Sequence, residues 1–184
     1  QTLPVARPKV SVAMCSYNRP ALLQRAIDSL LCQTTPDWEL LVCDNASSEP
    51  AINEILVEAM NDTRIRVWRT AENTGAPAIL WNFLFDRARG YYFAVLDDDN
   101  EKLPQFIERL SSVLDGQPQL DFVTCAWRVV GGAVADAERE CFLNLDTSVL
   151  NTRQGSTCDG GAVMYRRETF EKVGYFAEDI RTCE

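Results

Sequence analysis

Apolar positions follow two alternating patterns along the first two thirds of the chain. Short runs such as Val10–Met14 and Leu40–Cys43 carry apolar residues on both faces, as expected for strands that helices cover on both sides. Longer segments with a helical pattern of apolar residues separate these runs. In chain order, the predicted strands and helices are Lys9–Cys15, Ala21–Cys32, Glu39–Cys43, Ile52–Met60, Ile65–Trp68, Ala78–Arg89, Tyr91–Leu96, Gln105–Leu114 and Phe122–Trp127.

The regular alternation of strand and helix predicts βαβ units and a mostly parallel sheet. The expected fold class is therefore α/β, Rossmann-like, with helices on both faces of the sheet. Prolines mark the predicted helix starts, because a missing N–H does no harm in the first helical turn. These prolines are Pro20, Pro50, Pro77 and Pro104.

The last third of the chain begins with a segment of a different kind. Val129–Gly155 has no clear period, so we interpret it as an irregular excursion. Gly160–Tyr165 then predicts another strand, and Arg167–Val173 predicts a short helix that ends at Gly174. A length of 184 residues without a linker or repeat favours one domain spanning residues 1–184.

Composition narrows the possible partners. The formal net charge is -9, and no cluster of Lys and Arg appears, which argues against a nucleic-acid surface. An acidic protein also repels a phosphate-bearing substrate, so a bound cation becomes more necessary at any phosphate site. No stretch has the apolar length of a membrane span, and no signal-peptide pattern opens the chain.

The cysteines and the missing histidines exclude several classes of site. The chain has no His, which excludes His-based triads and leaves carboxylates as the obvious general bases. Seven scattered cysteines without a Cys-x-x-Cys pair argue against a zinc site or a disulfide framework. Reduced cysteines fit a cytoplasmic location, which we expect for this chain.

Polar clusters follow four successive predicted strands. Because ligands of open α/β sheets bind outside the carboxyl ends of strands, these clusters predict one shared site. Taken singly, each also fits an ordinary turn or cap. The four clusters are Ser16–Arg19, Asp44–Ser48, Asn73–Gly75 and Asp97–Asp99.

The triple aspartate Asp97–Asp99 is the strongest chemical signal in the chain. It follows the apolar run Tyr91–Leu96 directly, and Asn100 and Glu101 come straight after it. Crowded carboxylates repel one another, so a fold keeps them where a cation or a hydrogen-bonding ligand compensates. Oxygen ligands without His or Cys suit Mg²⁺ or Mn²⁺, which complete their shell with water and substrate phosphate. The alternative is a solvated acidic turn.

Several ordered motifs together resemble glycosyltransferase family 2, which has the GT-A fold, and the match runs through almost the whole chain. Within it, the acidic run and Asp159–Met164 are similar to the spore-coat polysaccharide glycosyltransferases. The matching motifs are Val10–Val12 with Ser16–Arg19, Ala26–Leu31 with Gln33–Thr34, Trp38–Leu40 with Asp44–Ser47, Asn73–Gly75, and Leu96–Asn100.

The resemblance implies an inverting transferase that moves a sugar from a nucleoside diphosphate donor to an acceptor hydroxyl. The acceptor would be a carbohydrate or glycoconjugate, and the cofactor Mn²⁺ or Mg²⁺. Asp97 and Asp99 match the Asp-x-Asp metal motif, and Asp159, Gly160 and Gly161 would face the donor or acceptor sugar. The nucleotide-binding positions implied by the family are Ser16, Tyr17, Asn18, Arg19, Asp44, Asn45, Asn73, Gly75, Asn82, Asp97 and Asp98.

Two positions depart from the family pattern. Asn45 stands where a second Asp is common, and it offers a donor as well as an acceptor to the base. UDP is the first expectation, since an Asn carbonyl can accept from a uracil N–H, while dTDP, CDP and GDP stay open. Trp81 stands where Arg is frequent, which removes a donor-phosphate contact unless Trp81 is simply a core residue of its helix.

The family's general base lies in an acidic Glu-Asp-Trp motif near the end of the domain. Glu184 matches the Glu of that motif, so we expect the domain to be truncated at its C-terminal end, just before the usual base. Glu184 or Asp179 could substitute as the base.

Two other functions compete with a transferase. A noncatalytic nucleotide-sugar-binding fragment is the first, and it is what a missing base would leave. A phosphoacceptor signalling domain is the second, and it fits poorly. Such domains draw their aspartates from the first and third strand ends and use a strand-end Lys, for which no counterpart is seen.

Overall fold

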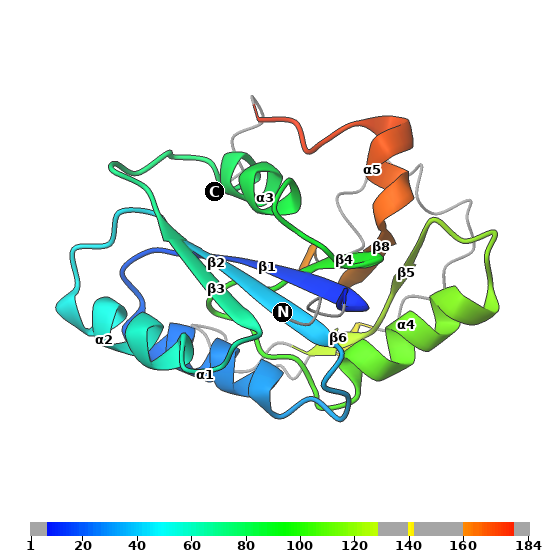
Figure 1. Ribbon diagram of the computed structural model, residues 1–184, viewed down its shortest axis with the longest axis horizontal. Coiled ribbons are helices and arrows are strands. Elements are labelled where there is room, and N and C mark those ends of the chain that lie inside the picture. Colours follow the sequence, from blue (N-terminus) through cyan, green and yellow to red (C-terminus); the bar gives the residue numbers. More distant parts are fainter. Residues whose placement is uncertain (1–6, 129–139, 142–159, 179–184) are drawn as a thin grey trace, which may run out of the picture.

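The computed structural model describes residues 7–128, 140–141 and 160–178. Its main feature is a six-stranded sheet in the order β3-β2-β1-β4-β8-β5 (Figure 1). The pairs β1/β2, β1/β4 and β2/β3 are parallel, whereas β8 is antiparallel to both β4 and β5. The strands are β1 Val10–Ser16, β2 Trp38–Asp44, β3 Ile65–Arg69, β4 Tyr92–Val95, β5 Phe122–Thr124 and β8 Val163–Arg166, and a separate pair joins β6 Trp127–Arg128 to β7 Glu140–Cys141.

Three of the helices begin on a proline, as the sequence predicts: Pro20, Pro50 and Pro77 each occupy the first helical turn. Pro104 is different, because the next helix starts at Phe106 with Gln105 at its N-cap. No helix in the described ranges is long and apolar enough to cross a bilayer. The helices are α1 Pro20–Leu31, α2 Pro50–Ala59, α3 Pro77–Phe85, α4 Phe106–Gly116 and α5 Arg167–Val173.

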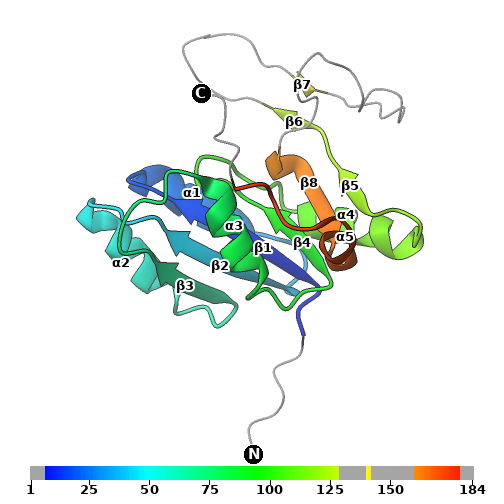
Figure 2. The ribbon, with the colours of Figure 1, turned by 90° about the horizontal axis from the view of Figure 1, so that it is seen from above.

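The helices cover both faces of the sheet, which confirms the predicted α/β class. Helices α1, α2 and α4 lie on one face, and α3 and α5 lie on the other (Figures 1 and 2). Alternate residues of β1 enter the two cores: Val12 and Met14 pack on the first face, and Ala13 packs on the second. Burial on both faces explains why the central strands have no polar face.

Helix α3 ends at Phe85, four residues before the predicted end at Arg89. After it, the Arg87 and Ala88 N–H groups donate three residues back, to Leu84 O and Phe85 O, both at 3.0 Å. The Arg89 N–H then donates to the buried Glu39 carboxylate of β2 at 2.6 Å, so the helix cannot continue through Arg89. Gly90 then passes so close to β1 that an added Cβ would lie 2.6 Å from the Ser11 backbone nitrogen.

The predicted strand Phe122–Trp127 divides into β5 and β6. Strand β5 pairs with β8 as far as Thr124, and the Cys125 N–H still donates to Ala162 O at 3.0 Å. Pairing stops there because Gly160–Ala162 forms a 3₁₀ turn, so the predicted strand at Gly160 also starts later, at Val163. Apart from β7, the expected irregular excursion 129–155 lies outside the described residues.

Candidate functional site

The four polar clusters expected to form a site follow β1, β2, β3 and β4. These strands are parallel to one another, so their carboxyl ends meet at one edge of the sheet. Strand β1 lies between β2 and β4, which places the switch in strand order between the loops after β1 and β4. Open α/β sheets bind ligands at such switch points.

Asp98 joins the loops on the two sides of the switch. Asp98 is 6% exposed, and its Oδ2 accepts the Tyr17 backbone N–H at 3.1 Å. Arg19 Nη1 lies 3.3 Å from Asp98 Oδ1 and 2.8 Å from Asp99 Oδ2. The Tyr17 residue itself is 46% exposed, so an aromatic surface is open to solvent at this edge.

Burial raises the pKa of the Asp98 carboxyl above its ordinary value. The Tyr17 N–H and the Arg19 guanidinium oppose this rise, and the neighbouring Asp99 carboxylate adds to it. A buried carboxylate next to a second carboxylate is costly to charge. The acidic loop, Asp97–Asp99, therefore favours a positive partner.

The Asn18 side chain binds the backbone at the start of α2. Its backbone is left-handed, with φ 54, and its N–H donates to Ser47 Oγ at 3.0 Å. Asn18 Oδ1 accepts the backbone N–H groups of Ser48 at 2.7 Å and Glu49 at 3.2 Å. Glu49 is the N-cap residue of α2, so Asn18 supplies acceptors that the helix end lacks.

Asp44 is fully buried at the end of β2. Its Oδ1 accepts the Ser47 N–H at 3.1 Å, and its Oδ2 lies 3.2 Å from Arg69 Nε in an ion pair without hydrogen-bond alignment. Arg69 also donates to the Ser47 carbonyl. Sequence reasoning missed Arg69, although a charged residue directly after the predicted strand Ile65–Trp68 was a usable signal; the structure places it in register with Asp44.

Asn45 ties the loop after β2 to the loop after β3. Its Oδ1 accepts the Thr74 N–H at 2.9 Å, and its Nδ2 donates to Asn73 Oδ1 at 3.3 Å. Asn73 Oδ1 also accepts the Gly75 N–H at 2.8 Å, and Gly75 has φ +73, which explains the glycine. The expected site residues of these two loops are therefore in contact.

Asn82 makes its contacts elsewhere, with the segment after α5. Its Nδ2 donates to Phe176 O at 2.9 Å and to Glu178 Oε1 at 2.8 Å, and its Oδ1 accepts the Phe176 N–H at 3.0 Å. Trp81 packs edge-on against Phe176, with ring centroids 5.4 Å apart. The alternative interpretation of Trp81, as a core residue, is the one that this packing favours.

The expected sugar-facing residues are only partly described. Gly160 and Gly161 lie in the 3₁₀ turn before β8, and the Gly161 carbonyl accepts a hydrogen bond from Lys102 Nζ. Lys102 is 8% exposed and follows the acidic loop by three residues; sequence reasoning missed it. Three of the predicted residues, Asp159, Asp179 and Glu184, lie outside the described residues.

The side chains near Asp98 offer the type of ligand atom that a hard divalent cation binds. They are carboxylate oxygens, which Mg²⁺ and Mn²⁺ prefer. No group of three or more His, Cys, Asp or Glu in the described residues is arranged to hold a metal on its own.

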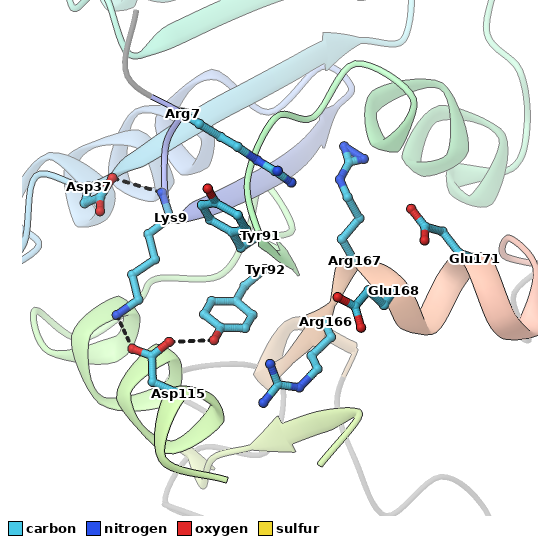
Figure 3. Close-up of a pocket in the computed structure, with 10 residues that line it drawn as sticks. All are labelled: Arg7, Lys9, Asp37, Tyr91, Tyr92, Asp115, Arg166, Arg167, Glu168 and Glu171. Atoms are coloured by element: carbon cyan, nitrogen blue, oxygen red, sulfur yellow. Dashed lines mark hydrogen bonds and ion pairs between the residues drawn. The ribbon is translucent and has the colours of Figure 1, made fainter. Parts of the chain in front are cut away.

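A cavity of about 650 Å³ lies at the opposite edge of the sheet, near the starts of β1 and β4 (Figure 3). Two of its lining groups form an ion pair: Lys9 Nζ lies 2.5 Å from Asp115 Oδ2, and the Tyr92 hydroxyl donates to Asp115 Oδ1 at 2.6 Å. Its lining arginines donate to backbone carbonyls. Volume alone would favour this cavity, but none of the polar strand-end clusters lies there. We therefore assign the candidate site to the carboxyl edge.

The sequence matches the family described as "Glycosyl transferase family 2" over residues 11–174. One relative, "Protein CgeD" of Bacillus subtilis (strain 168), is 27% identical over 184 residues, 94% of this chain and 43% of CgeD. Another, "Putative colanic acid biosynthesis glycosyl transferase WcaA" of Escherichia coli (strain K12), is 35% identical over 131 residues, 71% of this chain and 45% of WcaA. The chain thus spans less than half the length of either relative.

Solved structures resemble the fold closely. S. aureus TarS 1-349, determined in complex with UDP, matches with a TM-score of 0.76 and 19% identity, over 95% of this chain and 52% of that one. The mannosyltransferase PcManGT of Pyrobaculum calidifontis, in complex with GDP-Man and Mn²⁺, matches with a TM-score of 0.69 and 20% identity, over 96% and 50%. At these identities the likeness establishes a shared GT-A fold.

Proposed function

Because the chain belongs to glycosyl transferase family 2, we propose that it binds a nucleoside diphosphate sugar at the carboxyl edge of its sheet and transfers the sugar to an acceptor hydroxyl. The acceptor would be a growing polysaccharide or a glycoconjugate, in line with the name of the relative WcaA. The observation that carries this proposal is the meeting of the loops after β1 and β4 at Asp98.

UDP is the first candidate for the nucleotide. TarS, which has the same fold, was solved with UDP and with UDP-GlcNAc, whereas PcManGT was solved with GDP-Man, so GDP stays a competitor. Asn45 Oδ1 accepts the Thr74 N–H at 2.9 Å and the Thr70 hydroxyl at 3.4 Å. The Thr70 hydroxyl also reaches Asp44 O at 3.4 Å, so a uracil N–H would take its place on Asn45. The exposed Tyr17 ring offers a stacking surface for a base.

Mn²⁺ or Mg²⁺ would be held by Asp97 and Asp99, together with the donor diphosphate. When bound, the ion supplies Lewis-acid stabilisation of the negative charge that develops on the leaving diphosphate. Support comes from the oxygen-only donors of the acidic loop, from the half-exposed Asp99 side chain, and from the Mn²⁺ in PcManGT.

The transfer itself would be a single displacement with inversion. The acceptor oxygen forms a bond to the anomeric carbon, the bond from that carbon to the diphosphate oxygen breaks, and the acceptor proton passes to a general base. Asp179 and Glu184 are the proposed candidates for this base within the chain. Asn82 would hold the preceding segment through Phe176 and Glu178.

Calorimetric titration with UDP, dTDP, CDP and GDP, with and without Mn²⁺, tests this function. We expect metal-dependent binding of one nucleotide, weakened about tenfold or more by Asp99→Asn, since removal of one metal-binding carboxylate costs affinity on that scale. Asp28→Asn is a matched control, because it removes the same charge from an exposed position on α1. If none of the four nucleotides binds with Mn²⁺, or if both variants behave alike, the proposal is wrong.

A further inference from the structure

Arg19 forms ion pairs with two carboxylates of the acidic loop. Its Nη1 lies between two carboxylates, 3.3 Å from Asp98 Oδ1 and 2.8 Å from Asp99 Oδ2. Arg19 belongs to the loop after β1, and the two aspartates belong to the loop after β4. The contact therefore spans the switch in strand order where the donor diphosphate is proposed to bind.

The two carboxylates are held in different ways. The Asp98 side chain is 9% exposed, and its second oxygen accepts the Tyr17 backbone N–H, so Asp98 is anchored by the fold itself. The Asp99 side chain is 46% exposed, and among the described residues Arg19 is its hydrogen-bonding partner. The Arg19 side chain is itself 52% exposed, so the guanidinium can leave without moving the core.

A guanidinium and a divalent ion cannot both occupy this position at low cost. Both seek the outward oxygen of Asp99, and their positive charges repel at the short distances involved. A divalent ion carries twice the charge and approaches carboxylate oxygens to about 2.0–2.6 Å, closer than a guanidinium. A diphosphate, in turn, offers a guanidinium the planar two-oxygen contact that it binds best.

We propose that Arg19 is a positioning residue that, with Asp98 as its second partner, takes the place of the divalent ion on Asp99 until donor and metal bind together, when its guanidinium moves to the diphosphate. This inference rests on the proposed function. Metal alone must displace Arg19 without giving it a new partner, whereas metal with nucleotide provides one. The two ligands should therefore bind with positive coupling.

The test measures Mn²⁺ binding by electron paramagnetic resonance, without nucleotide and with UDP, dTDP, CDP or GDP. For Arg19→Gln without nucleotide, we expect Mn²⁺ to bind about two- to fivefold more tightly, the scale of one partly exposed ion pair. The variant should also lose most of the gain in Mn²⁺ affinity that nucleotide gives the unmodified protein. Its thermal stability should change little.

Arg25→Gln is the matched control. Arg25 also pairs with a residue near the acidic loop, Glu101, and both side chains are at least half exposed. The substitution removes the same charge without touching Asp98 or Asp99, so its Mn²⁺ affinity should stay close to that of the unmodified protein. Arg19→Lys should restore competition with Mn²⁺, because a lysine keeps the charge at this place.

The outcomes separate the two proposals. One outcome is that Arg19→Gln binds Mn²⁺ no more tightly than Arg25→Gln while the unmodified protein still binds a nucleotide with Mn²⁺. In that case the proposed exchange of Arg19 for the metal ion is wrong and the proposed function stands. If the unmodified protein binds none of the four nucleotides, the proposed function fails, and the exchange fails with it.

Discussion

Replacing Glu39 by glutamine should destabilise the fold by an amount that the structure allows us to work out. The Glu39 side chain is 1% exposed near the start of β2. Its Oε1 accepts the Ser11 hydroxyl and the Arg89 backbone N–H, both at 2.6 Å. Its Oε2 accepts Arg66 Nη2 and Arg89 Nε, both at 2.9 Å. Every lone pair of this buried carboxylate faces a donor.

A glutamine keeps one acceptor oxygen and turns an NH₂ group toward two of the four donors. A bond from a charged donor contributes about 1.5–3 kcal/mol. The least costly orientation faces the NH₂ group toward the guanidinium groups of Arg66 and Arg89, which are 32% and 41% exposed and can bind water instead. Allowing for that solvation, we expect the free energy of unfolding to fall by about 2–3 kcal/mol, which lowers Tm by roughly 5–10 °C.

The same variant has a pH signature. Burial by itself raises the pKa of Glu39, but the bonds from Ser11 and Arg89 and the charge of Arg66 outweigh it, so the pKa lies below the ordinary 4.5. A carboxyl whose pKa is lower in the folded state stabilises the fold above its unfolded pKa and loses that stabilisation as pH falls. The stability gap between the unmodified protein and Glu39→Gln should therefore be constant above pH 4.5 and narrow below it.

Urea denaturation between pH 3 and pH 7 measures this gap. Glu54→Gln is the control, because Glu54 is an exposed glutamate on α2 and its replacement should change stability by less than about 0.5 kcal/mol. A loss below about 1 kcal/mol for Glu39→Gln would refute the argument, since one charged hydrogen bond already exceeds it. A gap that stays the same down to pH 3 would refute the pH assignment.

Two further predictions concern backbone positions. Gly90→Ala should lower the free energy of unfolding by about 3 kcal/mol in urea denaturation, because its Cβ would lie 2.6 Å from the Ser11 backbone nitrogen. Gly116→Ala is the control and should change that free energy little, because no atom lies within 4 Å of the added Cβ. Asn18→Ala should lower the free energy of unfolding by about 1–2 kcal/mol and speed hydrogen exchange at the first turn of α2. It removes the bonds to Ser48 and Glu49, and alanine is disfavoured in the left-handed backbone conformation of this position. Asn18→Gly should recover the backbone part alone, and an equal cost for both variants would contradict this division.

Most of the fold could be predicted from the sequence, because strands buried on both faces and amphipathic helices leave direct periodic signals. The family expected from the motifs is confirmed by the match over residues 11–174. The ends of elements were harder where a distant group intervenes. Helix α3 cannot continue through Arg89, because Glu39, about fifty residues earlier in the chain, accepts the Arg89 N–H, and no local pattern indicates that bond.

The site was predictable as a location and less so as a set of contacts. Parallel strands must bring their carboxyl ends together, so the sequence could indicate the edge where Tyr17, Asn45 and Asp98 lie. It could not indicate that Asn18 caps α2 or that Asn82 binds Phe176, because an amide side chain serves as cap, bridge or ligand equally well. Those roles depend on partners that only the folded chain brings near.

The two edges of the sheet differ in how fully their carboxylates are bound. Glu39, toward the far edge, receives four donors within 2.9 Å, and a fully satisfied buried network of this kind is rigid. At the site edge, Asp99 accepts a hydrogen bond from the half-exposed Arg19, although a carboxylate has about four lone-pair positions to fill. The exposed part of Asp99 can bind water at its remaining positions, and a cation can replace that water without disturbing a buried network. On the proposed function, a substitution at Asp99 should therefore affect ligand affinity more than stability.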